Sequence, residues 1–424
     1  MNDLASIAAM LAAARPRAMA ALLRHFRDLD LAEEAAQEAC LRALKTWPRN
    51  GPPRDPEGWL IFVGRNAAID VTRRRAKQTA LPDEDLISDT GDAEAAAVES
   101  LDAADYRDDI LRLLFVCCHP ALPATQQIAL ALRVVSGLSV SEIARAFLVG
   151  DDAMEQRLTR AKRIVARERV PFEAPGAAGR AERLAAVAGM LYLLFNEGYA
   201  ASGGEAHVRA PLCDEAIRLA RLLLRMFPGE PGVMGLAALM LLQHARTPAR
   251  LDAHGAIVLL EDQDRARWNG TMIAEGLALL DKAMRHARPD PYQIQAAIAA
   301  LHARAARFED TDWAQIERLY ASLERVTPSP VVTLNRAVAV SKARGPAEAL
   351  AMIEPLAARL SGYFYFHGAR GALLRELGRL EEARVAFDHA ISRARTVAEA
   401  AHIRLQIDRL TAGAPDGAGA ARPP

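Results

Sequence analysis

Apolar residues recur every three or four positions along most of this chain, the spacing that places them on one face of an α-helix. In residues 59–75 this stripe comprises Leu60, Val63, Ala67 and Val71. Residues 137–169 contain two such stripes, separated at Gly150. The helical spacing continues through residues 181–410, and runs of Val, Ile and Thr that would favour strands are scarce. The pattern predicts an all-α protein.

Changes in charge divide the chain into parts. Residues 1–78 contain 13 Lys/Arg and 9 Asp/Glu, whereas residues 80–109 contain 11 acidic residues and one basic residue. A chain of 424 residues is also too long for one compact core. We predict a first domain at 1–78, an acidic linker at 79–109, a second small domain at 110–172, a helical extension at 180–410 and a disordered tail at 411–424.

The helical extension repeats small and larger apolar residues with a period of 34. Ala337 and Gly371 are one such pair, and Ile353 and Phe387 are another. A period of 34 with small residues where two helices cross is typical of tetratricopeptide repeats. The alternative is an Ala- and Leu-rich helical bundle without a true repeat. We favour the repeat, because several positions agree in one register.

The stretch "GLSVSEIARAFLVGDDAMEQRLTRAKRIVARER" (137–169) predicts a helix–turn–helix. Ser139 and Glu142 have the spacing of a capping box for its first helix. Gly150 ends that helix, and Asp151 or Asp152 can cap the next one. The second helix has the exposed polar residues that a DNA-recognition helix needs. Its candidate DNA contacts are Glu155, Gln156, Arg157, Arg160 and Arg163. The alternative is a basic amphipathic helix in an ordinary αα-hairpin.

The stretch "WLIFVGRNAAIDVTRRR" (59–75) combines aromatic residues with a basic end. Arginines can hold phosphates, aromatic rings can stack on unpaired bases, and an Asn can contact a base edge. Residues 46–58, rich in Pro, Gly and Arg, are expected to form a loop before this helix. The candidate nucleic-acid residues are Trp59, Phe62, Asn66, Arg73, Arg74 and Arg75. The alternative is a surface helix whose basic end suits the helix dipole.

In this order the segments resemble an extracytoplasmic-function sigma factor of bacterial RNA polymerase. Residues 29–44 resemble the helix that docks on the clamp coiled coil of the polymerase. Residues 59–75 resemble the helix that opens and contacts the −10 element, and residues 137–169 resemble the −35-binding domain. The later segments "GMLYLLFNEGYAASGG" and "VLLEDQDRARWNG", followed by the repeats, are similar to the sigma subgroup with a long C-terminal extension.

The resemblance implies specific partners and roles. Core RNA polymerase and promoter DNA are the expected partners, and a protein or peptide on the repeat surface is a further candidate. Glu34, Gln37 and Glu38 share one face of the helix at 31–45 and are the candidate polymerase contacts. The acidic linker would thread the RNA channel and mimic nucleic acid, or it would only keep the chain soluble. The extension would either mask the DNA-binding helices or add contacts that promoter binding needs.

We find no sequence pattern for catalysis or for a cofactor. Phosphate-binding loops, zinc-protease and serine-hydrolase motifs are absent from the sequence, so we predict a non-enzyme without cofactor or metal. "CCHP" (117–120) lacks the spacing of a zinc site. Four cysteines without a CxxC pair indicate a reducing, cytoplasmic compartment, and we expect neither a secretory signal nor a membrane span.

Two polar segments of the extension are left without an assigned role. They are "NEGY" (196–199) and "EDQDRARW" (261–268). We favour buried salt bridges between repeats over a ligand or polymerase surface. Two rivals to the sigma-factor hypothesis also stay open: a helix–turn–helix activator regulated by the repeats, and a helical-repeat scaffold that binds no DNA.

Overall fold

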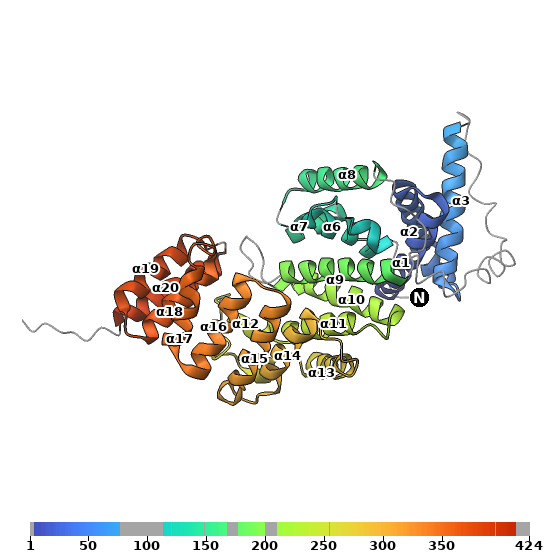
Figure 1. The fold of residues 1–424 in the computed structure, drawn as a ribbon. Helices are drawn as coiled ribbons and strands as arrows, with labels where there is room; N and C mark the ends of the chain where they lie inside the picture. The colour runs from blue at the N-terminus through green and yellow to red at the C-terminus, as the bar shows by residue number, and fades with distance from the viewer. Residues whose placement is uncertain are drawn as a thin grey trace, which may run out of the picture. The chain divides into compact units, whose positions relative to one another are not determined.

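The computed structural model describes residues 4–76, 113–119, 121–147, 149–167, 177–199, 210–253, 255–394 and 396–412. Over these residues the secondary structure is helical apart from one isolated bridge between Leu251 and Ile257, so the predicted all-α class is confirmed. The predicted linker lies outside the described residues, and so does the predicted tail except for residues 411–412, which belong to the last helix. No described helix is both long enough and apolar enough to cross a membrane. The chain forms two units, residues 1–193 and 194–424, coloured in sequence order in Figure 1.

Three helices open the first unit: α1 (Leu4–Phe26), α2 (Leu29–Asn50) and α3 (Pro56–Ala76), each packed on the other two. Helix α2 begins at an Asp28 cap whose side chain accepts a hydrogen bond from the Leu31 amide at 3.0 Å. Their shared core contains Trp47 and Leu60, which are 2% and 1% exposed. The core therefore fixes the direction of α3 at its N-terminal half.

The loop predicted at residues 46–58 is shorter than expected. Helix α2 continues to Asn50 with Pro48 inside its last turn, and α3 begins at Pro56. Burial of Trp47 between the helices stabilises that last turn, and Gly51 ends it with a positive φ of 79°. Only residues 51–55 form a loop.

The second part of the first unit contains the predicted helix–turn–helix. It consists of α6 (Ala124–Ala131), a π-helical turn η2 (Leu132–Ser136), α7 (Val140–Phe147) and α8 (Asp151–Arg167). Gly137, with a φ of 76°, ends η2 in the left-handed region. The side chains of Met154, Leu158, Ala161 and Val165 on α8 are buried, as the sequence pattern predicts.

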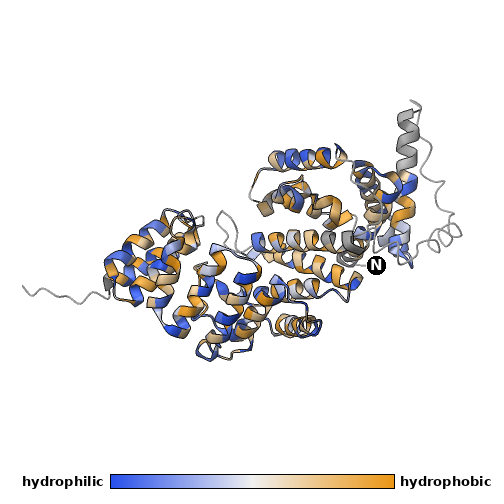
Figure 2. Ribbon diagram, viewed as in Figure 1, coloured by the Kyte–Doolittle hydropathy of each residue, from blue (hydrophilic) through white to orange (hydrophobic). Residues whose placement is uncertain are grey.

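Helix α9 (Ala177–Tyr199) spans the boundary between the units. The second unit continues with α10 (Ala210–Met226), α11 (Pro231–His244), α12 (Thr247–Arg250), η3 (Arg265–Arg267), α13 (Gly270–Met284), α14 (Pro291–Arg304), η4 (Phe308–Asp310), α15 (Trp313–Val326), α16 (Pro330–Arg344), α17 (Pro346–Ile353), η5 (Glu354–Leu356), α18 (Phe364–Glu376), α19 (Leu380–Ile391) and α20 (Val397–Ala412). From α13 onward, each α-helix packs against the next one along the chain. Most of these helices carry both polar and apolar residues (Figure 2).

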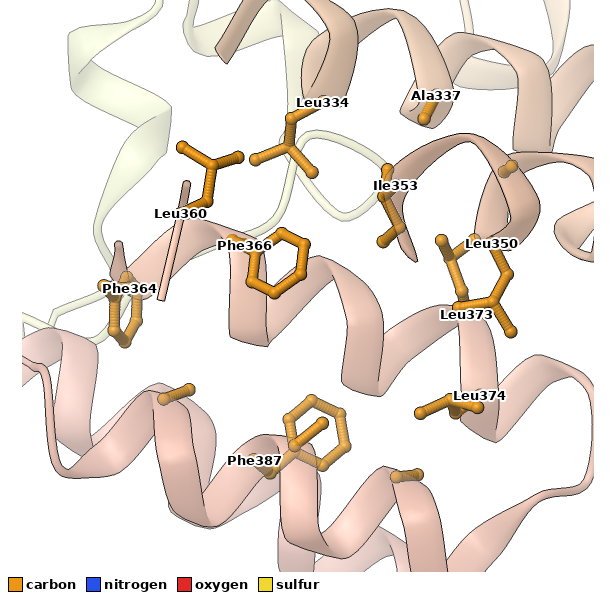
Figure 3. Close-up of a cluster of buried hydrophobic side chains, with 14 of the residues drawn as sticks. Leu334, Ala337, Leu350, Ile353, Leu360, Phe364, Phe366, Leu373, Leu374 and Phe387 are labelled. Atoms are coloured by element: carbon orange, nitrogen blue, oxygen red, sulfur yellow. The ribbon is translucent and has the colours of Figure 1, made fainter. Parts of the chain in front are cut away.

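The small residues of the 34-residue pattern lie where helices approach closely. A Cβ atom placed on Gly371 of α18 would lie 2.6 Å from Cδ1 of Phe387 on α19, so only glycine fits there. Ala383, Phe387 and Ala390 are buried in the same cluster, which also includes Leu334 and Ile353 from α16 and α17 (Figure 3). Repeat-like packing of this region agrees with the sequence pattern, and its assignment as a tetratricopeptide domain stays a prediction.

Candidate nucleic-acid interface

Helix α8 presents the predicted recognition residues on the face opposite its buried stripe. Glu155, Gln156, Arg160 and Arg163 are exposed, and Arg157 is half-buried. Exposed guanidinium and amide groups on one helix face are the groups that contact phosphates and base edges in a DNA groove. All five predicted side chains therefore face away from the buried stripe of α8, and Arg157 is the least exposed of them.

Local hydrogen bonds fix the start of α7 and join α7 to α8. The Ser139 amide donates to Glu142 Oε2 at 2.7 Å, and the Glu142 amide donates to Ser139 Oγ at 3.2 Å, which completes the predicted capping box. The Ser141 hydroxyl donates to the carboxylate of Asp151, the first residue of α8. The capping box fixes the start of α7, and the Ser141–Asp151 bond joins the two helices of the helix–turn–helix.

Helix α3 places the predicted aromatic residues at the edge of the three-helix core. The Trp59 ring is half-buried and packs edge-on against Trp47, with ring centroids 5.3 Å apart. Phe62 is half-buried and Asn66 is exposed. The backbone of residues 73–75 belongs to α3, but the side chains of the three predicted arginines lie outside the described residues. The interface of α3 is thus partly positioned by Trp47, which the sequence analysis did not select.

The predicted polymerase contacts lie together on α2. Glu34 is exposed, and Gln37 and Glu38 are half-buried. The Gln37 side-chain amide donates to Glu33 Oε1 at 2.9 Å, and Glu38 forms an ion pair with Arg42 at 2.9 Å. Two of the three candidate side chains are therefore held by neighbours on their own helix.

An ion-pair cluster that sequence analysis missed joins the two halves of the first unit. Glu33 of α2 is 3% exposed. Its carboxylate lies 2.6 Å from Nε of Arg133 on η2 and 2.7 Å from Nζ of Lys162 on α8. Lys162 also pairs with Asp30 at 2.8 Å. Burial lowers the pKa of Lys162, but its hydrogen bonds to Asp30 and Glu33 outweigh this effect and raise the pKa overall.

Arg15 of α1 adds a second contact between these halves. Its side chain is buried, and a Cβ atom on Gly137 would lie 2.5 Å from Arg15 Cδ. Burial lowers the pKa of Arg15, and the nearby Glu33 carboxylate partly offsets this effect. Burial also raises the pKa of the Cys40 thiol, which interacts with the Arg15 side chain. The glycine after η2 therefore permits α1 to approach the helix–turn–helix closely.

The described residues contain no group of three His, Cys, Asp or Glu side chains that could hold a metal ion. Cys117 and Cys118 are both buried and free. Burial raises the pKa of Cys118 to about 12, and it also raises the pKa of Cys117 well above its ordinary value. Neutral buried thiols are packing groups rather than metal ligands.

The fold and these surfaces define a class: an all-α protein with a helix–turn–helix that follows a three-helix domain with a solvent-facing aromatic and polar helix. Comparison with known proteins specifies it further. Residues 10–78 match sigma-70 region 2, residues 112–165 match sigma-70 region 4, and residues 183–284 match a family of unknown function, DUF6596. The chain is also 68% identical over 412 residues to an uncharacterized protein of Rhizobium meliloti (strain 1021), covering 97% of each chain. No solved structure matches it.

The chain belongs to the sigma factors that resemble the extracytoplasmic-function type, with an additional C-terminal domain. Sigma-70 regions 2 and 4 serve promoter recognition, so RNA polymerase and promoter DNA are its partners. The order of regions found from the sequence is confirmed. The individual contacts on α2, α3 and α8 stay predictions.

Proposed function

We propose that helix α8 binds the −35 element and helix α3 binds the −10 element of promoters selected by this chain. The exposed face of α8 supports the first assignment, because Gln156, Arg160 and Arg163 lie together with no described neighbour covering them. Trp59 and Asn66 support the second assignment. Trp59 packs at the edge of the domain core, and Asn66 is exposed further along the same helix. Base contacts from α8 would set specificity, and arginine contacts with phosphates would set affinity.

We propose further that Glu34, Gln37 and Glu38 dock region 2 on the polymerase. Carboxylate and amide groups on one helix face suit a partner rich in arginine. Docking would release Gln37 and Glu38 from their present hydrogen bonds with Glu33 and Arg42. Because Gln37 donates to Glu33, we expect docking to compete with the ion pairs that Glu33 forms with Arg133 and Lys162.

Promoter binding also requires regions 2 and 4 to separate. The −35 and −10 elements differ by 25 base pairs in position, which at about 3.4 Å per base pair is about 85 Å of B-form DNA. In the described arrangement, Lys162 of the recognition helix lies 2.7 Å from Glu33 of region 2. Both elements cannot be bound while this contact is made. We infer that the described arrangement is the form of the chain before it binds DNA.

The C-terminal extension is proposed to modulate activity in cis. It follows region 4 after a short segment, and its stacked helices offer surface for a protein or peptide. We favour an extension that transcription requires over one that masks α8. Truncation after Glu173 would test this in transcription assays: full activity without the extension contradicts a required role, and raised activity indicates masking.

The proposed function is tested by transcription on fragmented genomic DNA from the organism that encodes the chain. Core polymerase with the full chain should start transcripts at a common sequence that polymerase alone does not use. Arg160→Ala should weaken initiation, whereas Arg267→Ala, an exposed arginine of the second unit, should not. Initiation that is equal with and without the chain would contradict the proposal. Promoter-specific binding without polymerase would instead favour a helix–turn–helix activator.

A further inference from the structure

Three arginines of the second unit gather around two aromatic rings. Arg246 and Arg265 both lie over the Trp268 ring, with Cζ atoms 5.4 and 4.6 Å from its centroid. Arg250 lies over the Tyr199 ring at 3.7 Å. All three arginine side chains are half-buried, and Nη2 of Arg265 is itself buried. We call Arg246, Arg250 and Arg265 the arginine cluster.

The members of this cluster bind neutral partners in the described part of the chain. Arg246 Nε donates to the Gln263 side-chain carbonyl at 3.3 Å. Arg250 donates to the backbone carbonyl of Tyr199, and Arg265 donates to backbone carbonyls of the α14 C-terminal turn. None of the three forms an ion pair with any carboxylate among the described residues, which exclude residues 200–209. In the segment 261–268, Glu261 pairs with Lys342 at 3.7 Å, but Glu261 is exposed, so this pair is not one of the predicted buried salt bridges.

Two donors at the centre of the cluster have no partner. Arg265 Nη2 and Trp268 Nε1 are buried and donate no hydrogen bond within the described structure. Trp268 is 7% exposed. Buried donors without acceptors destabilise a fold, and close arginines repel one another. A negatively charged hydrogen-bond acceptor would bond to these two donors and would also offset the repulsion between the arginines.

The positive charge of the cluster affects a nearby histidine. Burial, together with Arg246 and Arg265, lowers the pKa of His302 to about 4. Burial and Arg246 lower the pKa of Arg265, and this effect outweighs the opposite effect of the acids Glu309 and Asp310. Asp310 is moreover paired with Arg307 at 3.3 Å. The cluster therefore keeps an excess of positive charge.

The backbone that presents the cluster is held by its own hydrogen bonds. His244 at the end of α11 bonds to Asp214 of α10 at 2.9 Å and to Thr247 of α12 at 3.0 Å. The Gln263 amide donates to the Val258 carbonyl at 3.1 Å, which ties the segment before η3 to the loop after α12. The arginines are thus placed by a fixed corner of the fold rather than by a free loop.

We propose that the arginine cluster is a binding site for a multiply charged oxyanion, either a carboxylate or a phosphate compound. Guanidinium groups match both oxyanions with paired hydrogen bonds. Three cations without a described carboxylate call for a ligand with at least two negative charges. Arg265 Nη2 and Trp268 Nε1 supply donors that are already free of other partners. All three arginines fall within residues 183–284, so the site belongs to the DUF6596 region, and the proposal does not depend on promoter binding.

The test uses the full chain and two probes, sodium phosphate and sodium citrate, against sodium chloride at equal ionic strength. Calorimetric titration should show saturable binding of at least one probe, with one site per chain. Arg246→Gln and Arg265→Gln should each weaken that binding by at least about tenfold, because each removes a charge-assisted hydrogen bond. Arg267→Gln is the matched control, since Arg267 lies in the same turn, is exposed and makes no described side-chain contact. Binding of citrate alone identifies a carboxylate site, and binding of phosphate alone identifies a phosphate site.

A second measurement on the unaltered chain covers the case in which a variant fails to fold. Histidine titration by nuclear magnetic resonance should show a rise in the pKa of His302 when the probe saturates the site, since the anion offsets the charge of Arg246 and Arg265. Heats equal to those of chloride for both probes would overturn the proposal. So would binding that survives both cluster variants, or a pKa of His302 that the bound probe leaves unchanged.

Discussion

The contact between regions 2 and 4 should weaken when Glu33 loses its charge. Glu33→Gln keeps the size of the side chain and its hydrogen bond with Gln37 but leaves Arg133 and Lys162 without their shared carboxylate. Both cations keep about a fifth of their side-chain surface exposed, 20% for Arg133 and 22% for Lys162. Water can therefore solvate these two cations and offset part of the interaction energy that is lost with the carboxylate.

The expected cost follows from this burial. Removal of one partner from a fully buried ion pair costs about 3–5 kcal/mol. Partial exposure of the two cations reduces the cost here to about 2–4 kcal/mol, which at 1.4 kcal/mol per factor of ten lowers the ratio of closed to open chains by about 30-fold to 700-fold. Asp30 retains an ion pair with Lys162, so the smaller figure is the safer expectation.

Small-angle scattering and hydrogen exchange measure the effect. The radius of gyration should rise in Glu33→Gln, and the amides of η2 and α8 should exchange faster. Asp152→Asn is the control, because Asp152 is an exposed acid on α8 outside the cluster. Scattering and exchange identical to those of the unaltered chain would refute the role of Glu33 in holding the two regions together.

Three further predictions concern other parts of the chain. Arg160→Ala should weaken protection of the −35 element in footprints of the polymerase complex by about 1–3 kcal/mol, and unchanged protection would remove Arg160 from the interface. Phe387→Ala should lower the free energy of unfolding of the second unit by about 3–5 kcal/mol in chemical denaturation, because its buried ring fills the space against Gly371; a loss below 1 kcal/mol would contradict that packing. The pKa of His302 lies at about 4, below the value of 6.5 expected for the unfolded chain, so its neutral ring stabilises the fold fully above pH 6.5 and this contribution disappears as the pH falls towards 4. The loss should be about 2–3 kcal/mol in acid titrations of stability and should be absent in His302→Gln.

Local patterns were sufficient to predict the helix–turn–helix and its buried face. Ser139 and Glu142 are three residues apart, and a capping box needs nothing else. The buried stripe of α8 follows from helical spacing alone. The close approach at Gly371 was also visible, since a small residue recurs there at the fixed period of 34.

Contacts between distant segments were not predictable in the same way. Glu33 and Lys162 are far apart in sequence, and each looks like an ordinary surface charge on an amphipathic helix. Arg246 and Arg265 meet only because the segment between α12 and α13 returns to the start of α12 and places Trp268 beside Arg246. The loop predicted from Pro48 failed for a related reason: burial of Trp47 outweighed the local preference of the prolines.

The central claim is that this chain is a sigma factor, and binding to core polymerase tests it most directly. The full chain, mixed with purified bacterial core RNA polymerase, should elute with it as a complex of one chain per polymerase. An excess of a primary sigma factor should displace it, because sigma factors share a docking surface, and alanine at Glu34, Gln37 and Glu38 together should weaken the complex. Absence of a complex under conditions where the primary sigma factor binds would contradict the account.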